Sequence, residues 1–330
     1  MPFRDLVGHH RIASLLARAI GREALPPSLL FGGPDGVGKR TAALGTAQAL
    51  NCLAPIRGTA LDVDACGQCA ACRRIERGMH PDVVTVKPGD TGSIKIEAVR
   101  DVIESANYRP FEGRRRVVVV DEADALGVPA QNALLKTLEE PRPASVFILV
   151  SAQPDRLLPT VRSRCAHIRF GRLSVDDLVT VLVERCEYTE REARTAAPVA
   201  DGSVRHALDA RETDLAAARE SAHELLARSA NAGDLRGRLG LVKDLVADRE
   251  ALAAVLRALS SLLRDVAVLT SRATGCRLAN VDLTPQLERL THAFDSRRTI
   301  RAFTAVDGAL GALERNAGPK VVADWLAVQL

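Results

Sequence analysis

The stretch that decides the fold is Gly32-Gly33-Pro34-Asp35-Gly36-Val37-Gly38-Lys39-Arg40-Thr41. It follows a short apolar run at 28–31, typical of a buried strand, and leads into a helical pattern that ends near residue 50. Glycines let backbone N–H groups converge on phosphate oxygens, the following helix N-terminus adds its dipole, and Lys39 reaches the terminal phosphates. The pattern predicts a P-loop that binds ATP or ADP through Gly33, Pro34, Asp35, Gly36, Val37, Gly38, Lys39, Arg40 and Thr41.

One position departs from the P-loop pattern. Ser or Thr normally follows the lysine, because its hydroxyl ligates Mg²⁺, and here that residue is Arg40. Thr41 is a poor substitute, since consecutive residues on an α-helix point about 100° apart. Arg40 either brings positive charge towards the phosphates or points to solvent, and both remain open at this point. We therefore expect nucleotide binding, with the use of Mg²⁺ and hydrolysis uncertain.

A valine run at 117–120 ends in Asp121 and Glu122. A buried strand followed by two carboxylates is the second half of a P-loop ATPase site, in which the first organises the metal and the second activates water. A simple helix start is the alternative interpretation. We predict that Asp121 and Glu122 are catalytic if hydrolysis occurs.

The overall pattern predicts an α/β fold with a parallel five-stranded sheet and helices on both faces, because continuous apolar runs alternate with helical segments. The runs lie at 28–31, 83–86, 117–120, 146–150 and 167–170. Ser174, followed three residues later by Asp177, resembles a helix N-terminus. We expect three domains, namely 1–171, a small helical domain at 172–211 and an all-α domain at 212–330.

Composition limits the function classes. The 330 residues carry a net charge of only +4, which does not by itself indicate nucleic-acid binding. The run 114–116 is all arginine, for which a solvated charge run is favoured over contact with DNA phosphates. No segment approaches the roughly 20 apolar residues that cross a bilayer, and residues 1–5 lack the charged-then-apolar pattern of a leader. We expect a soluble cytoplasmic protein without membrane contact.

Four of the seven cysteines form a module at about 52–80, namely Cys52, Cys66, Cys69 and Cys72. Thiolates two residues apart can bind one metal, and four of them complete a closed tetrahedral zinc site. The spacing therefore predicts structural Zn²⁺. Four free cysteines are the alternative, and His80 is a candidate replacement ligand or a turn residue.

Further motifs follow in a fixed order. After the P-loop, the cysteine module and the acidic strand come 131–141, Gln-Asn-Ala-Leu-Leu-Lys-Thr-Leu-Glu-Glu-Pro, and 163–165, Ser-Arg-Cys. With them the chain resembles bacterial clamp-loader subunits, which are AAA+ proteins of the DNA polymerase III holoenzyme. The segment 107–114 and the altered P-loop resemble the delta-prime branch most, with gamma/tau as the close relative.

The resemblance implies roles for further residues. Arg164 matches the arginine finger, which acts on ATP held by a neighbouring subunit and is catalytic in trans. Arg205 matches the lid arginine called sensor 2, and Ser151 stands near the sensor 1 position. Val7 and Gly8 resemble the segment that wraps the adenine. A lone surface arginine or a capping hydroxyl is the ordinary interpretation of the first three.

The resemblance also implies an architecture and partners. The region 172–211 is expected to be the lid, and 212–330 the collar through which gamma/tau and delta subunits form a pentameric ring. Through that complex the chain would act on the sliding clamp and primed DNA. The leading hypothesis is a delta-prime-like subunit with weak or absent ATPase activity of its own.

Two other functions remain open. The first is an ATP-hydrolysing gamma/tau-like subunit, because Lys39, Asp121, Glu122 and Arg205 are all present. The second is a zinc-dependent nucleic-acid-binding protein or helicase, suggested by the cysteine module and by the letters Asp-Glu-Ala-Asp at 121–124.

Overall fold

The computed structural model describes residues 1–58, 61–89, 91–211, 215–231, 235–245, 249–273, 276, 278–315 and 317–330. These residues form two compact units, Met1–Leu173 and Ser174–Leu330, and each is described by itself. Among the described residues, no helix is both long enough and apolar enough to cross a membrane.

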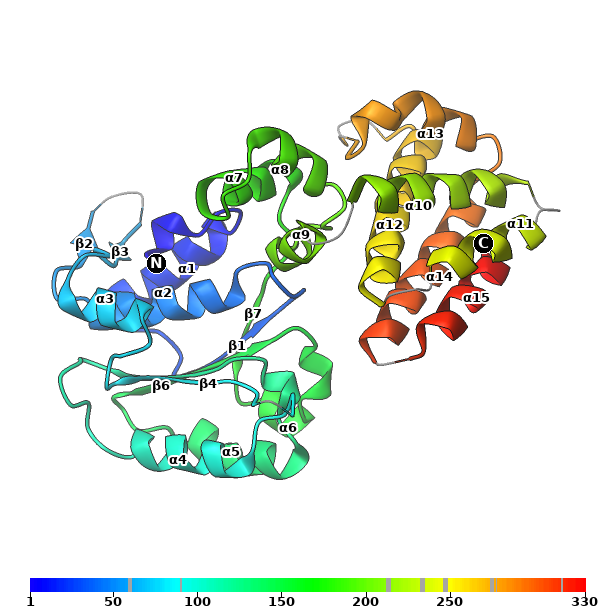
Figure 1. The fold of residues 1–330 in the computed structure, drawn as a ribbon. Helices are drawn as coiled ribbons and strands as arrows, with labels where there is room; N and C mark the ends of the chain where they lie inside the picture. The colour runs from blue at the N-terminus through cyan, green and yellow to red at the C-terminus, as the bar shows by residue number, and fades with distance from the viewer. Residues whose placement is uncertain are drawn as a thin grey trace. The chain divides into compact units, whose positions relative to one another are not determined.

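The first unit alternates strands and helices, as Figure 1 shows. Its elements are η1 (Phe3–Asp5), α1 (His10–Gly21), β1 (Ser28–Gly32), α2 (Lys39–Asn51), β2 (Ile56–Arg57), β3 (Val63–Asp64), α3 (Ala70–Glu76), β4 (Val83–Val86), α4 (Ile96–Ala106), β5 (Arg116–Val120), η2 (Ala123–Ala125), α5 (Val128–Glu139), β6 (Ser145–Ser151), η3 (Pro154–Arg156), α6 (Pro159–Arg162) and β7 (Ala166–Arg169).

Five of these strands form one parallel sheet in the order β4-β5-β6-β1-β7. β1 lies between β6 and β7, so that Phe31 is opposite both Val150 and Ile168. Parallel neighbours require crossover connections, which α2, α4 and α5 supply. The short strands β2 and β3 form a separate antiparallel pair.

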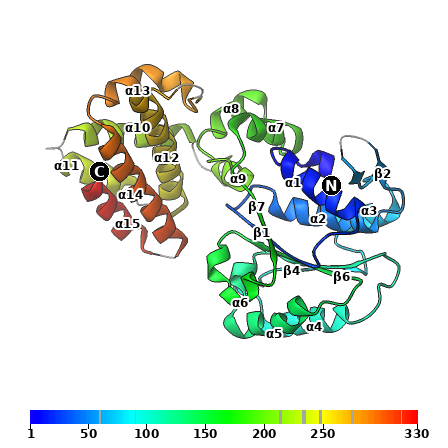
Figure 2. The same cartoon turned by 180° about the vertical axis from the view of Figure 1, so that it is seen from behind.

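Both faces of the sheet are buried, because successive side chains of a strand point to opposite faces. Leu29 and Phe31 pack with Leu16 of α1 and Ala43 of α2, whereas Leu30 belongs to the core on the other face. That second core contains residues of α4 and α5. Figures 1 and 2 show α1 and α2 on one side of the sheet and α4 and α5 on the other. This explains why the strands have continuous apolar sequences.

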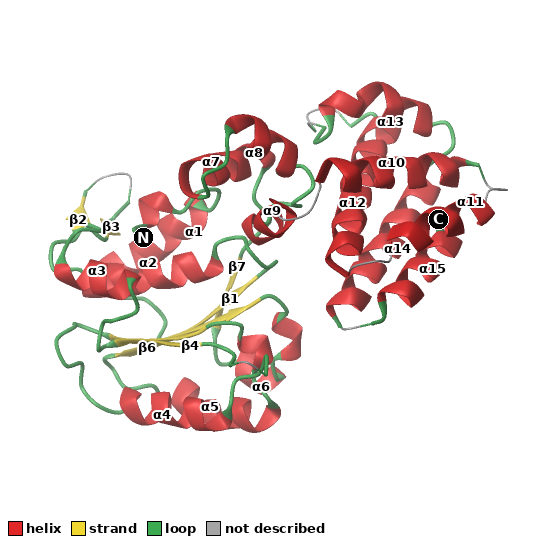
Figure 3. Ribbon diagram, viewed as in Figure 1, coloured by secondary structure: helices red, strands yellow, loops and turns green. Residues whose placement is uncertain are grey.

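The described residues of the second unit form helices joined by loops, with no strand among them, as the colouring of Figure 3 shows. Its elements are α7 (Val175–Arg185), α8 (Glu190–Ala196), α9 (Val204–Arg211), α10 (Leu215–Ala230), α11 (Leu235–Leu245), α12 (Arg249–Ser271), η4 (Val281–Leu283), α13 (Thr284–Leu290), α14 (Ser296–Glu314) and α15 (Pro319–Gln329). Ser174 caps α7 by accepting a hydrogen bond from Asp177 N. Helices α10 and α12 to α15 share one leucine- and alanine-rich core.

The fold confirms the prediction of an α/β protein with a five-stranded parallel sheet covered on both faces and followed by a helical region. Each apolar run named from the sequence corresponds to a strand, and no end of a run differs from the end of its strand by more than one residue. The predicted boundary at 211/212 adjoins residues 212–214, which lie outside the described residues.

Candidate nucleotide site and cysteine cluster

The predicted P-loop leaves the carboxyl end of β1 and enters α2. Gly36 and Gly38 have φ values of 68° and 101°, in the left-handed region that glycine tolerates best. At Gly33, with φ of 150°, a Cβ would lie 2.2 Å from the carbonyl oxygen of Phe170. The loop therefore depends on glycine for its backbone conformation and, at Gly33, for space.

Lys39 begins α2, and its ammonium folds back onto the loop. Nζ donates hydrogen bonds to the carbonyl oxygens of Gly33 and Pro34, at 2.8 and 2.5 Å. Burial lowers the pKa of Lys39, although Asp35 and Asp124 oppose this shift. A phosphate entering the loop would replace the two carbonyls as partner of the ammonium group.

The side chain of Arg40 extends towards a carboxylate of the candidate site. Its Nε lies 3.4 Å from Oδ2 of Asp121, the carboxylate at the end of β5, while the arginine side chain stays 57% exposed. Burial raises the pKa of Asp121, and the guanidinium opposes that shift. A fixed positive charge therefore stands beside the carboxylate that was predicted to organise the metal. Thr41 follows on α2 and is half-buried.

Glu122 is exposed and adopts a left-handed backbone conformation, with φ of 50°. A non-glycine residue in this region costs of order 1 kcal/mol, and such residues concentrate at functional sites. Next to it, Asp124 in η2 accepts hydrogen bonds from Ser151 Oγ at 2.6 Å and from Ala152 N at 3.0 Å. Asp124 was not predicted as a site residue, although it lies three positions after Asp121.

The segment containing Val7 and Gly8 lies close to the loop. Its neighbour His9 is buried, and His9 Nε2 is 2.9 Å from the carbonyl oxygen of Val37. Val7 is half-buried, whereas Gly8 is exposed with φ of 76°. The predicted contact of Val7 and Gly8 with adenine remains a prediction.

The four cysteines of the module converge. Ligand atoms of Cys52, Cys66, Cys69 and Cys72 lie within 4.8 Å of one another, and Sγ of Cys52 is 4.0 Å from Sγ of Cys69. A tetrahedral zinc site with Zn–S bonds of about 2.3 Å has sulfur–sulfur separations of about 3.8 Å. The cluster therefore fits a metal ion such as zinc.

Burial and hydrogen bonds shift the pKa values of these thiols in different directions. Burial raises the pKa of Cys52 and of Cys72. For Cys69, burial acts upward, but N–H groups of Cys72 and Leu53 and the neighbouring thiols together lower its pKa to about 6. Backbone N–H groups also donate to the sulfurs, as from Cys66 N to Cys52 Sγ at 3.3 Å. Such N–H···S contacts would stabilise thiolates around a metal.

His80 is not part of this cluster. Its Nδ1 accepts a hydrogen bond from Asp82 N, and its Nε2 lies 3.5 Å from Glu112 Oε1. The module instead contacts the N-terminal segment, where Arg4 donates to the carbonyl oxygens of Ala65 and Cys66. The cysteine cluster thus ties distant parts of the first unit together.

Arg164 follows α6 and lies near the end of α5. Nη1 donates to the carbonyl oxygen of Thr160 at 3.0 Å, and Nη2 pairs with Oε2 of Glu139 at 3.3 Å. The side chain is 32% exposed. Arg205, the other predicted arginine, lies exposed on α9 of the second unit. Both roles remain predictions.

The comparisons with known proteins identify the family. The model of the family described as "DNA polymerase III, delta subunit" matches residues 8–174, just over half of the chain. The chain belongs to the DNA polymerase III clamp-loader subunits. The match covers the whole sheet, the P-loop and the cysteine module of this AAA+ protein.

Curated clamp-loader relatives of two types are similar to this chain. Subunit tau of Bacillus subtilis is 33% identical over 212 residues, which cover 62% of this chain and 36% of the relative. Subunit delta' of Pseudomonas aeruginosa is 40% identical over 148 residues, which cover 44% of each. Subunit delta' of Bacillus subtilis is 35% identical over 175 residues, 53% of this chain and 51% of the relative.

The similarity thus spans about a third of the tau relative and about half of the delta' relatives. The matched family is that of clamp-loader subunits, which gives no support to the helicase hypothesis. Family membership does not distinguish the tau type from the delta' type, because relatives of both types are similar to this chain.

Proposed function

We propose that the chain is a delta-prime-like clamp-loader subunit with weak or absent ATPase activity of its own. The observation that carries the proposal is the contact between Arg40 and Asp121. A P-loop ATPase needs a hydroxyl after the lysine and a free carboxylate to hold Mg²⁺. Here a guanidinium replaces the hydroxyl and faces the carboxylate, so that it repels a divalent cation from both.

The catalytic contribution of the subunit would be made to its neighbour in the ring. Arg164 donates to the carbonyl oxygen of Thr160 and pairs with the carboxylate of Glu139, which is 58% exposed. A surface ion pair of this kind contributes about 0–1 kcal/mol, so the guanidinium can exchange Glu139 for a phosphate at little cost. A guanidinium aimed at the γ-phosphate stabilises the charge that develops in the transition state.

The proposed role includes partners and cofactors. The subunit would join gamma/tau and delta subunits in a pentameric ring through its collar, and the ring would load the sliding clamp onto primed DNA in the cytoplasm. The cysteine cluster would hold structural Zn²⁺, because four thiols leave no open position for chemistry.

The alternative is a gamma/tau-like subunit that hydrolyses ATP. It is favoured by the tau relatives and by the assembly of Lys39, Asp121 and Glu122 around the loop. The two functions differ in which site this chain serves. A delta-prime-like subunit acts on the neighbour's nucleotide, whereas a gamma/tau-like subunit acts on its own.

The test is ATP turnover by the complex reconstituted from this chain and the partner subunits of the same organism. Arg164→Ala should reduce turnover at the neighbouring site by about 100-fold or more with assembly intact. Arg162→Ala is the matched control, because Arg162 ends the short helix α6, two residues before Arg164, and pairs with Asp155. Glu122→Gln should leave turnover unchanged. Loss of turnover in Glu122→Gln, with Arg164→Ala unaffected, would establish the alternative.

A further inference from the structure

A pocket of about 480 Å³ lies at the amino-terminal edge of the sheet in the first unit. Its walls come from the residues that precede β1, β5 and β6, such as Pro27, Arg115 and Pro143, and from the end of α2 and strand β2. The P-loop follows the carboxyl end of β1. The pocket is therefore separate from the nucleotide site, and its volume is in the range of ligand sites.

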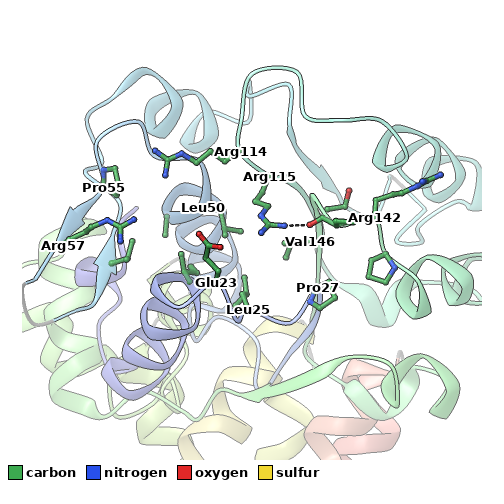
Figure 4. Close-up of a pocket in the computed structure, with 16 residues that line it drawn as sticks. Glu23, Leu25, Pro27, Leu50, Pro55, Arg57, Arg114, Arg115, Arg142 and Val146 are labelled. Atoms are coloured by element: carbon green, nitrogen blue, oxygen red, sulfur yellow. Dashed lines mark hydrogen bonds between the residues drawn. The ribbon is translucent and has the colours of Figure 1, made fainter.

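Positive charge dominates this pocket. Four arginines are among its lining residues, namely Arg57, Arg114, Arg115 and Arg142, whereas Glu23 is the one acidic residue. Figure 4 shows Arg57 and Arg142 at opposite ends, with Arg115 between them. We name this feature the arginine pocket.

The charges of the arginine pocket are compensated only in part, since Glu23 is the one carboxylate among its lining residues. Within the described part of the chain, no carboxylate lies within ion-pair distance of Arg57, Arg114 or Arg142. Arg115 donates instead to the carbonyl oxygen of Pro143. Arginines elsewhere in the unit, such as Arg4 and Arg74, have carboxylate partners. An anionic ligand would relieve the repulsion among the four guanidiniums.

Buried polar groups hold the backbone of residues 111–115, which lead into β5, in place. Asp82, which is fully buried, accepts hydrogen bonds from the N–H groups of residues 111–113 at 2.6 to 2.9 Å. Asn51 accepts from Arg115 N and donates to Arg115 O, both at 3.0 Å. The interpretation of 114–116 as a solvated charge run is wrong for Arg116, whose buried side chain pairs with Asp82 at 3.0 Å.

These hydrogen bonds fix the backbone of residues 111–115, which favours ligand binding. A segment whose conformation is set before the ligand arrives loses little conformational entropy on binding. Prolines at the rim, among them Pro55 and Pro141, restrict the backbone further. The arginine pocket is thus a preorganised cationic surface.

The floor of the pocket is apolar and aliphatic, with Leu25, Leu50 and Val146 in the lining. No aromatic side chain lines it, so the stacking platform that single-stranded nucleic acids use is missing from this site. Guanidinium forks match carboxylates in bidentate geometry, and an aliphatic floor matches aliphatic side chains. We propose that the arginine pocket binds an acidic peptide segment of a partner protein, with carboxylates on the arginines and an apolar side chain on the floor.

The test uses the full chain and fluorescence anisotropy with a labelled heptapeptide of alternating aspartate and leucine. The pocket variant combines Arg57→Glu and Arg142→Glu, which change exposed side chains at its two ends. The control variant combines Arg100→Glu and Arg156→Glu, which make the same change of charge at exposed positions outside the pocket. The peptide should bind the pocket variant at least about tenfold more weakly than wild type, and the control variant within about twofold, since each tenfold is about 1.4 kcal/mol.

Two further probes complete the design. A peptide with glycine in place of every leucine should bind wild type at least about tenfold more weakly, because it keeps the charge and loses the apolar contact. If charge reversal disturbs folding, as judged by circular dichroism, the milder variants Arg57→Gln and Arg142→Gln replace it. They should also bind the peptide more weakly than wild type. An oligothymidylate should not compete with the peptide.

Three results would overturn the proposal. Equal affinity for the two peptides would mean that any polyanion binds. Oligothymidylate binding that the pocket variant abolishes, without competition by the peptide, would assign the site to nucleic acid. Absence of peptide binding to wild type, or binding unchanged in both the Glu and Gln variants, would remove the site altogether.

Discussion

Nε of Arg40 lies 3.4 Å from Oδ2 of Asp121, which joins the position after the P-loop lysine to the carboxylate at the end of β5. The arginine side chain is 57% exposed, so the ion pair itself contributes at most about 1 kcal/mol. The main consequence of this ion pair is for metal binding. A fixed positive charge replaces a metal ligand at the point where a divalent cation would bind.

Replacing Arg40 should therefore change how nucleotide binding depends on metal. In Arg40→Thr, Mg²⁺ should tighten ATP binding by about tenfold or more, because the variant supplies a hydroxyl and frees Asp121. In wild type, Mg²⁺ should change the affinity by less than about twofold. Isothermal titration with and without Mg²⁺ measures both. Arg100→Thr, an exposed position on α4, is the control. Binding that responds to Mg²⁺ equally in wild type and Arg40→Thr would contradict this account.

The cysteine cluster should contain metal. Purified chain should hold about one Zn²⁺ by elemental analysis, and its removal by a chelator should lower Tm, because structural zinc stabilises the folded form by several kcal/mol. Cys69→Ser should have the same effect, whereas Cys276→Ser, which changes an exposed cysteine outside the cluster, should have none. A chain with intact fold and less than about a tenth of an equivalent of any metal would exclude the site.

Asp82 should make the first unit sensitive to acid. Burial acts to raise its pKa, but the N–H groups of Glu112, Phe111 and Gly113 and the Arg116 guanidinium outweigh it, so the net shift is downward. A carboxyl with a depressed folded pKa stabilises the protein above its unfolded pKa of about 3.9. That stabilisation is lost as the pH falls through the lower folded pKa.

The matching variant is Asp82→Asn. It should lower the free energy of unfolding at pH 7 by about 3 kcal/mol, because it leaves the buried Arg116 guanidinium without its carboxylate. Urea denaturation at pH 7 and at pH 3 measures both effects, and the deficit should shrink at the lower pH. Asp101→Asn, at an exposed position on α4, should change stability by less than about 0.5 kcal/mol. A deficit of equal size at both pH values would rule out the charge of Asp82 as its cause.

Gly33→Ala should damage both stability and nucleotide binding. A Cβ at this position would approach Phe170 O to 2.2 Å, and β1 or β7 would have to move, which we expect to cost about 3 kcal/mol. Gly171→Ala is the control next to Phe170, since a Cβ there meets nothing within 4 Å. Thermal denaturation and ATP titration measure the two effects. Equal behaviour of the two variants would disprove the close-packing argument for Gly33.

The fold was largely predictable because its signals are local. Five apolar runs separated by helical patterns correspond to five parallel strands, and glycines at 33, 36 and 38 correspond to left-handed or crowded backbone positions. The convergence of the four cysteines also followed from spacing, since residues 66, 69 and 72 lie on one turn and the start of α3.

Several site residues were not predictable, because their roles depend on contacts across the sequence. In the sequence Asp82 is a polar residue before a predicted strand. In the structure its carboxylate accepts hydrogen bonds from backbone N–H groups 29 to 31 residues away. Asn51 likewise accepts a hydrogen bond from the N–H group of Arg115, 64 residues away. Asp124 accepts a hydrogen bond from the hydroxyl group of Ser151, which is 27 residues away in the sequence. Nothing in the local pattern around these residues distinguishes them from ordinary surface positions.

The sequence by itself determined the P-loop, the order of strands and helices, the set of four cysteines and the departure at Arg40. These features follow from backbone preference and from the period of apolar residues, which act over a few positions. Only the tertiary structure decided the direction of Arg40, because the strand that carries Asp121 is 81 residues away and its end is brought beside α2 by the sheet. The same long-range packing gathered the arginine pocket from four separate segments.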